Sequence, residues 1–194
     1  MHIFYGSDDE DSPDMRRRKA EIRKIADFLA QRQEIERAAA VDAVKGKWDK
    51  PAEAGWDWNY ILLGDFNIIS PEHGTMAALE DAGFTVATKP HRTNLGSNMH
   101  YDQIAYRAAH PGFEVRKSGV FSMLDHVYRD VDASHYVEVA KIAKLTENGR
   151  TGTRAKAYFK QYYRRQQLSD HKLLWAEIYI DYSHEYLQAV IDET

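Results

Sequence analysis

The sequence predicts an α+β fold, with a mainly antiparallel or mixed sheet and helices on one face of it. Short apolar segments bounded by polar turns are typical of strands. A longer segment after Ser12 and Pro13 has apolar residues at helical spacing instead. The chain of 194 residues, 43% hydrophobic and 29% charged, is long enough for one soluble domain with its own core.

The first part of the chain is predicted to form a short strand at residues 2–6 and then a long helix. Ser12 can cap the free amides of this helix, and Pro13 fits its first position. The apolar residues at helical spacing are Met15, Ile22, Ile25, Ala26 and Leu29. The many arginines and lysines around them are interpreted as one solvated helix face.

The middle of the chain is predicted to alternate between strands and a second helix. Residues 59–66 are apolar without alternation, which is typical of a strand covered on both faces. Ser70-Pro71 predicts the start of a helix that ends at Gly83. Further strands are expected at residues 85–88 and 101–107, on either side of a polar loop.

The region from residue 112 to residue 168 has the weakest pattern. It predicts strands at 115–121 and 136–139 and a basic, aromatic helix at 154–164. The tyrosines and phenylalanine of that helix are interpreted as core residues, with base stacking as the alternative. A clear strand follows at 173–180, and Ser183 is expected to cap a terminal helix at 183–192.

Three polar motifs lie at or beside predicted strands. They are Gly64-Asp65-Phe66-Asn67, Tyr101-Asp102-Gln103-Ile104 and Ser169-Asp170-His171. A packed strand holds a carboxylate, an amide or an imidazole rigidly at a sheet edge. Metal-assisted chemistry on phosphate esters uses groups of these kinds.

In this order, the three motifs resemble the GDxN, YDxI and SDH signatures of the endonuclease/exonuclease/phosphatase superfamily, the deoxyribonuclease-like metal phosphoesterases. His2, in the segment His2-Ile3-Phe4-Tyr5-Gly6, resembles the family's first catalytic histidine. The resemblance covers nearly the whole chain and implies a deoxyribonuclease-like α/β sandwich.

The resemblance is to the C-terminal part of that four-layer fold, as a single domain at residues 1–194. Family members begin with one strand that carries an asparagine and another that carries a metal-binding glutamate. No counterpart of either precedes His2. The N-terminal part is therefore expected to be missing, and a homodimer or a separately supplied half is expected to cover the apolar strand faces.

The resemblance also implies a role for each motif residue. Asp65 would orient or deprotonate the attacking water, and Asn67 would donate to a phosphoryl oxygen from the same face of an extended chain. Asp102 would pair with His2 and hold its tautomer. His171 would contact the scissile phosphate, Asp170 would contribute to the metal region, and the cofactor would be Mg²⁺ or Mn²⁺.

The expected function is accordingly a magnesium-dependent phosphoesterase, either a nuclease or a small-molecule phosphatase. The alternative is a catalytically incomplete half-domain that needs a partner or a homodimer. A nucleic-acid-binding module without catalysis is the third hypothesis. The net charge of −4 argues against it, because general binding to nucleic acid usually leaves a basic surface.

The composition sets further bounds on location and chemistry. The chain has no cysteine, which excludes disulfides and thiolate zinc sites. It has no apolar run of about 18 residues, so no membrane partner is expected. Cytoplasm is the default expectation, although a preceding segment could have carried a signal.

Overall fold

The computed structural model describes residues 1–139, 147–183, 187–188 and 191. The chain divides into two compact units, and each is described by itself. The first unit comprises residues 1–91, 99–119 and 174–194, and the second comprises residues 92–98 and 120–173. The α+β class with antiparallel sheets is confirmed. The assignment of residues 1–194 to a single family domain stays a prediction.

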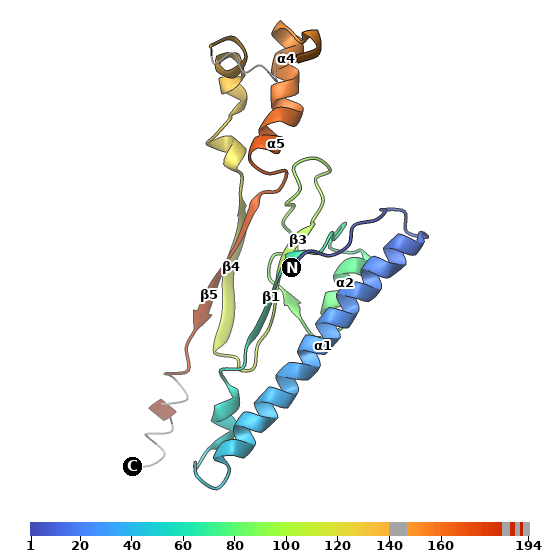
Figure 1. Ribbon diagram of the computed structural model, residues 1–194. Helices are drawn as coiled ribbons and strands as arrows, with labels where there is room; N and C mark the ends of the chain where they lie inside the picture. Colours follow the sequence, from blue (N-terminus) through green and yellow to red (C-terminus); the bar gives the residue numbers. More distant parts are fainter. Residues whose placement is uncertain (140–146, 184–186, 189–190, 192–194) are drawn as a thin grey trace. The chain divides into compact units, whose positions relative to one another are not determined.

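Helix α1 (Pro13–Val44) is the longest element of the first unit. As predicted, it begins after Ser12, whose hydroxyl accepts the N–H of Met15 at 3.0 Å. Its inner face contributes Ile22 and Ala26 to the core, and both are fully buried. Figure 1 shows α1 beside α2 (Gly74–Glu80), on the same side of strand β1.

The prediction that all basic residues of α1 face solvent is wrong for Arg18, which is fully buried. Gln33, further along the helix, is fully buried as well. Its amide donates to the carbonyl oxygens of Trp58 (2.6 Å) and Arg107 (2.7 Å). Buried polar groups of this kind are stable only when hydrogen-bonded, and here they join α1 to the ends of the sheet.

A three-stranded antiparallel sheet with the order β1-β3-β2 lies against the helices. Its strands are β1 (Tyr60–Asp65), β2 (Thr85–Val86) and β3 (Asp102–Arg107), close to their predicted positions. Leu62 and Ala105 lie opposite each other, and both belong to the core that the helices complete. The expectation that β1 is covered on both faces is wrong, because Ile61 and Leu63 are 42% and 57% exposed.

The structure differs from two other expectations for the first unit, which concern the strand at residues 2–6 and the start of the second helix. Residues 2–6 form no continuous strand; only His2 makes a parallel bridge, to Asp65. Helix α2 begins at Gly74 rather than at Ser70-Pro71, because His73 caps it by accepting the N–H of Thr75.

Strands β4 (Phe113–Phe121) and β5 (Leu173–Ile180) lie close to their predicted positions. They pair in a second, two-stranded sheet, a pairing that the sequence did not predict. The far end of β5 is fixed in the first unit by Tyr182. The Tyr182 ring lies 5.8 Å from that of Trp56, and its hydroxyl donates to the Trp56 carbonyl oxygen at 3.1 Å. Most of the terminal helix expected at 183–192 lies outside the described residues.

The second unit is helical and has its own small core. The expected helix at 154–164 is observed as α4 (Gly152–Tyr158), a π-helical stretch (Phe159–Tyr163) and α5 (Arg164–Gln167). The strand expected at 136–139 is wrong, because His135–Val139 forms a π-helical turn. The core cluster consists of Ala133, Val137, Ala155, Phe159 and Tyr163. Among the described residues of both units, no helix combines the length and the apolar character that crossing a bilayer requires.

Candidate functional site

Asp65 and Asp102, the acidic pair, lie directly opposite each other at one end of the first sheet. Asp65 is the last residue of β1 and Asp102 the first residue of β3, and the antiparallel register makes them Cα partners. Opposite residues in such a pair project from the same face of the sheet, so the two carboxylates are neighbours. Like charges in this position destabilise a sheet unless a cation or a proton lies between them.

The Asp65 carboxylate is held in place by the turn that follows β1. Its Oδ1 accepts the backbone N–H of Asn67 at 2.9 Å, as in an Asx turn. The Asp65 side chain is 18% exposed, and its Oδ2 lies 3.5 Å from Nε2 of His2. The second oxygen of Asp65 therefore points toward an imidazole rather than into the protein.

Asn67 differs from its expected geometry. Its φ of 52° places it in the left-handed region, so it does not continue an extended strand beyond Asp65. The side chain is buried, and its amide donates to the Ile3 carbonyl oxygen at 2.7 Å. This contact fixes the N-terminal segment beside β1, which is a positioning role. The expected donation to a phosphoryl oxygen stays a prediction.

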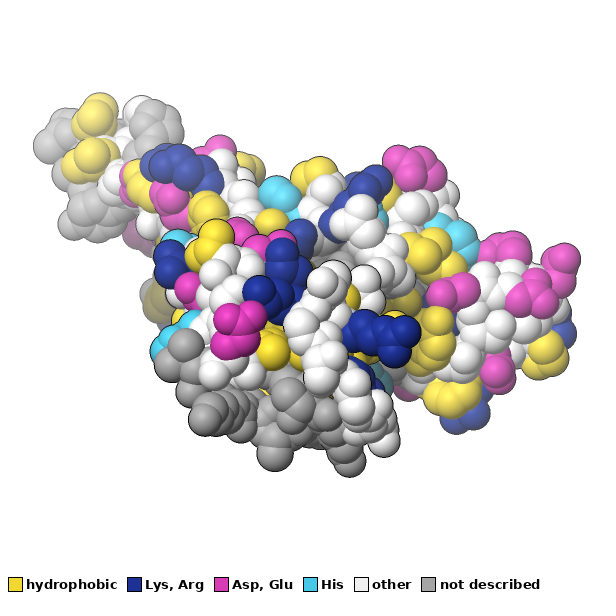
Figure 2. Space-filling view, turned by 90° about the horizontal axis from the view of Figure 1, so that it is seen from above, with side chains coloured by type: hydrophobic (Ala, Val, Ile, Leu, Met, Phe, Trp, Pro, Cys, Tyr) yellow, Lys and Arg dark blue, Asp and Glu magenta, His cyan; other side chains and the backbone are white. Residues whose placement is uncertain are grey.

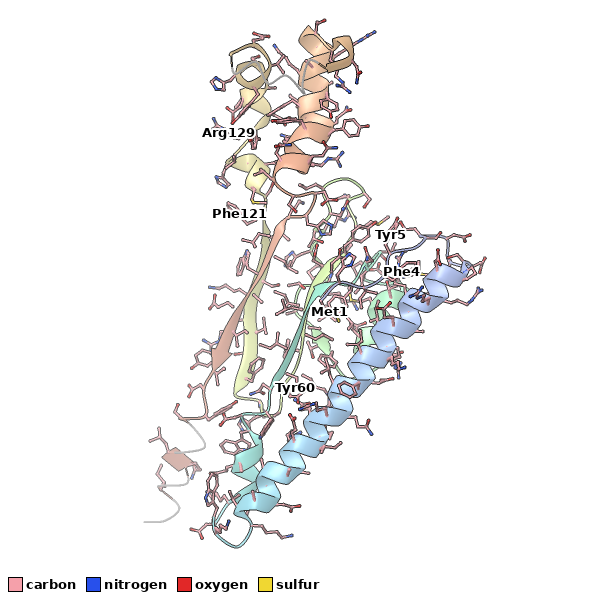
Figure 3. All side chains as sticks on the ribbon, viewed as in Figure 1. Met1, Phe4, Tyr5, Tyr60, Phe121 and Arg129 are labelled. Carbon is pink, nitrogen blue, oxygen red and sulfur yellow. The ribbon has the colours of Figure 1, made fainter. Side chains whose placement is uncertain are left out.

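His2 belongs to the same corner of the first unit. The resemblance assigned Asp102 as its partner, whereas the ion pair that the structure gives for His2 is with Asp65. The His2 side chain is 73% exposed. Figure 3 shows the N-terminal segment passing β1 at Met1 and reaching the first turns of α1 at Phe4 and Tyr5.

Arg18 supports this corner from the helix, and sequence reasoning missed it. All five of its N–H groups donate: to the carbonyl oxygens of Tyr5, Ser7 and Asn67 and to the Asp8 carboxylate. The Asn67 bond is 3.0 Å long and the Asp8 bond 3.1 Å. The guanidinium also lies 4.8 Å from the centre of the Tyr5 ring.

Tyr5 belongs to the N-terminal segment that Arg18 holds. It donates to Asp8 at 2.7 Å, and this bond, together with burial, raises the pKa of the phenol above its ordinary value. Its ring meets that of Tyr101, the neighbour of Asp102, edge-on at 6.0 Å. Tyr5 therefore stays protonated across the physiological range.

Asp170 and His171 belong to the second unit. Ser169 fixes their turn, because its Oγ accepts the N–H of His171 at 3.0 Å. His171 makes an antiparallel bridge to Asn94. Asp170 Oδ1 lies 4.0 Å from His171 Nε2, and the two side chains are 67% and 23% exposed.

Comparison of the chain with family models gives no match. Comparisons with curated proteins and with solved structures give no match either. The functional argument therefore depends on the motifs and on the geometry of the acidic pair.

Proposed function

We propose that this chain is a divalent-metal-dependent phosphoesterase of the deoxyribonuclease-like type, acting either as a nuclease or as a small-molecule phosphatase. The observation that carries the proposal is the acidic pair. It brings together the aspartates of two separate motifs, which are 37 positions apart (102 minus 65), as Cα partners on one sheet face. Random surface acids rarely occupy opposed positions in a sheet, because their repulsion has to be offset.

The residues present fit Mg²⁺ or Mn²⁺. Both ions prefer carboxylate oxygens, and the repulsion within the acidic pair is offset when a cation lies between them. Asp65 and Asp102 each offer one carboxylate oxygen as a ligand. We propose that Asp65 and Asp102 hold the ion. The roles expected for Asp170 and His171, which belong to the second unit, stay predictions.

The bound ion would neutralise charge on the phosphoryl group and favour attack by water. Asp65, with one oxygen fixed by the Asn67 N–H, would orient that water through the other. His2 would take up or release a proton beside Asp65, and its exposure leaves it accessible to a substrate. Arg18 and Asn67 would hold this geometry without touching the substrate.

The proposal predicts hydrolysis of bis-p-nitrophenyl phosphate that requires added Mg²⁺ or Mn²⁺. Asp65→Asn is expected to lower kcat/KM by about 100-fold or more, because it removes a charge that the ion and the water both need. Asp49→Asn, at an exposed acid outside the site, is the matched control and should leave turnover unchanged. Turnover in EDTA, or equal rates for the two variants, would refute the proposal.

A second candidate is the catalytically incomplete half-domain that acts with a partner or as a homodimer. The exposure of Ile61 and Leu63 on one face of β1 favours it. Under this alternative, light scattering at high micromolar concentration gives a dimer, or the purified chain gives no turnover. A monomer that hydrolyses the diester excludes it.

A further inference from the structure

The helical segment 152–167 of the second unit has an inner and an outer aromatic face. Phe159 and Tyr163 are buried in the small core, whereas Tyr162 between them is 52% exposed. The helix is π-helical from Phe159 to Tyr163. Such stretches occur frequently at functional sites, because the wider turn redirects side chains.

On the outer face, two tyrosine rings stack on each other and an arginine lies at each end of the pair. The rings of Tyr158 and Tyr162 are stacked, with centroids 5.8 Å apart and an interplanar angle of 27°. The Arg150 guanidinium lies 3.9 Å from the centre of the Tyr158 ring. At the other end, the Arg165 guanidinium lies 5.6 Å from the centre of the Tyr162 ring. Tyr162 is therefore a partly exposed stacking surface next to a cation.

The segment has basic charges and no acidic residue. Its basic residues are Arg154, Lys156, Lys160, Arg164 and Arg165. Lys156 pairs with Glu138, and Lys160 and Arg164 share Asp130. Within the described part of the chain, no carboxylate pairs with Arg154 or Arg165, so these two can bind an added anion. Figure 2 shows Lys and Arg side chains next to hydrophobic ones on the face seen from above.

Arg165 lines two hollows of the second unit. A cavity of about 640 Å³ is lined by Tyr162, Arg165, Gln166, Leu168, Ser169 and Asp170. A second cavity, of about 330 Å³, is lined by Arg165 together with Leu95, Gly96, Leu124, Lys160, Gln161 and Arg164. A Cβ on Gly96 would lie 2.6 Å from Arg165 Nη1, so a side chain at this position would require the guanidinium to shift.

We infer that this outer face binds single-stranded nucleic acid, with a base stacked on Tyr162 and a phosphate held by Arg165. Exposed rings that alternate with cations are the usual means of binding single strands, because every unpaired base presents a flat face. The bases of a duplex are already stacked on one another. Single-stranded nucleic acid would then be the substrate of the phosphoesterase, and in this respect the inference rests on the proposed function. The binding step itself needs no metal.

The test is fluorescence anisotropy with a labelled oligo(dT) or oligo(U) of about 12 nucleotides, in EDTA and about 50 mM salt. Tyr162→Ala is expected to weaken binding about 10-fold, and Tyr162→Phe to leave it unchanged, because the ring rather than the hydroxyl stacks. Arg165→Gln should weaken binding and reduce the slope of log affinity against log salt by about 0.7. The controls, Phe28→Ala and Lys24→Gln, change an exposed ring and an exposed cation of α1 and should bind like wild type.

Wild-type affinity retained by Tyr162→Ala would overturn the inference, and so would equal affinity for a duplex or no binding of either oligonucleotide. Two further results separate it from the proposed function. Asp65→Asn should bind the oligonucleotide normally and lack hydrolysis. Tyr162→Ala should hydrolyse bis-p-nitrophenyl phosphate, which needs no stacking platform, at the wild-type rate.

Discussion

Arg18→Met is expected to lower the free energy of unfolding by about 3–5 kcal/mol, the usual cost of removing one partner from a buried charged network. Methionine fills much of the same volume but donates no hydrogen bond. The carbonyl oxygens of Tyr5, Ser7 and Asn67 would then be left without the donor that now pairs with them. Urea unfolding followed by far-UV circular dichroism measures the change.

The matched control is Lys24→Met, on the exposed face of the same helix. It makes a similar change of side chain and should alter the free energy of unfolding by no more than about 0.5 kcal/mol. Equal stabilities of the two variants would mean that Arg18 does not have the buried, fully bonded position described for it.

Gly64→Ala is expected to destabilise the first unit by about 3 kcal/mol and to displace the N-terminal segment from β1. A Cβ at this position would overlap the backbone of Met1, whose nitrogen would be only 2.7 Å away. The φ of 154° at Gly64 adds strain for any residue with a side chain. Hydrogen exchange should detect the change at Ile3 and Asp65, whose N–H groups bond across this contact.

Gly55→Ala is the control for this prediction. A Cβ on Gly55 would lie 3.6 Å from the nearest atom, in Val41, which is an ordinary contact. It should leave exchange at Ile3 and Asp65 unchanged. If Gly64→Ala keeps the wild-type stability and exchange pattern, the close approach of Met1 to β1 is refuted.

The elements that sequence predicts well are those whose signals are local. The Ser12 cap marks the start of α1 because the hydroxyl and the amide it accepts are three residues apart. The strand at 173–180 is evident from its composition alone. The expected strand at 136–139 fails because Tyr136 and Val137 pack in a helical turn against the aromatic helix. That is a long-range contact which composition does not encode.

The prediction that Arg18 is exposed was wrong for a different reason. Arg18 lies three residues after Met15 and four before Ile22, so it occupies the same stripe of the helix as these buried residues. Its spacing therefore indicated burial, but its charge was taken as evidence of exposure. What the sequence could not supply is the set of acceptors that makes burial tolerable: the carbonyl oxygens of Tyr5, Ser7 and Asn67 and the carboxylate of Asp8.

The candidate site is predicted in part. Two motifs place Asp65 and Asp102 at strand ends, and the antiparallel register makes them opposite partners. Asn67 was expected to continue an extended strand, but its backbone is left-handed. The sequence could not predict this conformation, because it depends on the contacts that hold Asn67 in place. The proximity of His2 to Asp65 depends on the close approach that Gly64 allows.

The most direct test of the central claim is the binding of Mn²⁺, measured by electron paramagnetic resonance and by calorimetry. The proposed site predicts one tightly bound ion per chain, with an affinity at least about 10-fold lower in both Asp65→Asn and Asp102→Asn. Asp49→Asn should bind the ion like wild type. Unchanged affinity in the two site variants, or no bound ion in the wild-type chain, would contradict a metal site at the acidic pair.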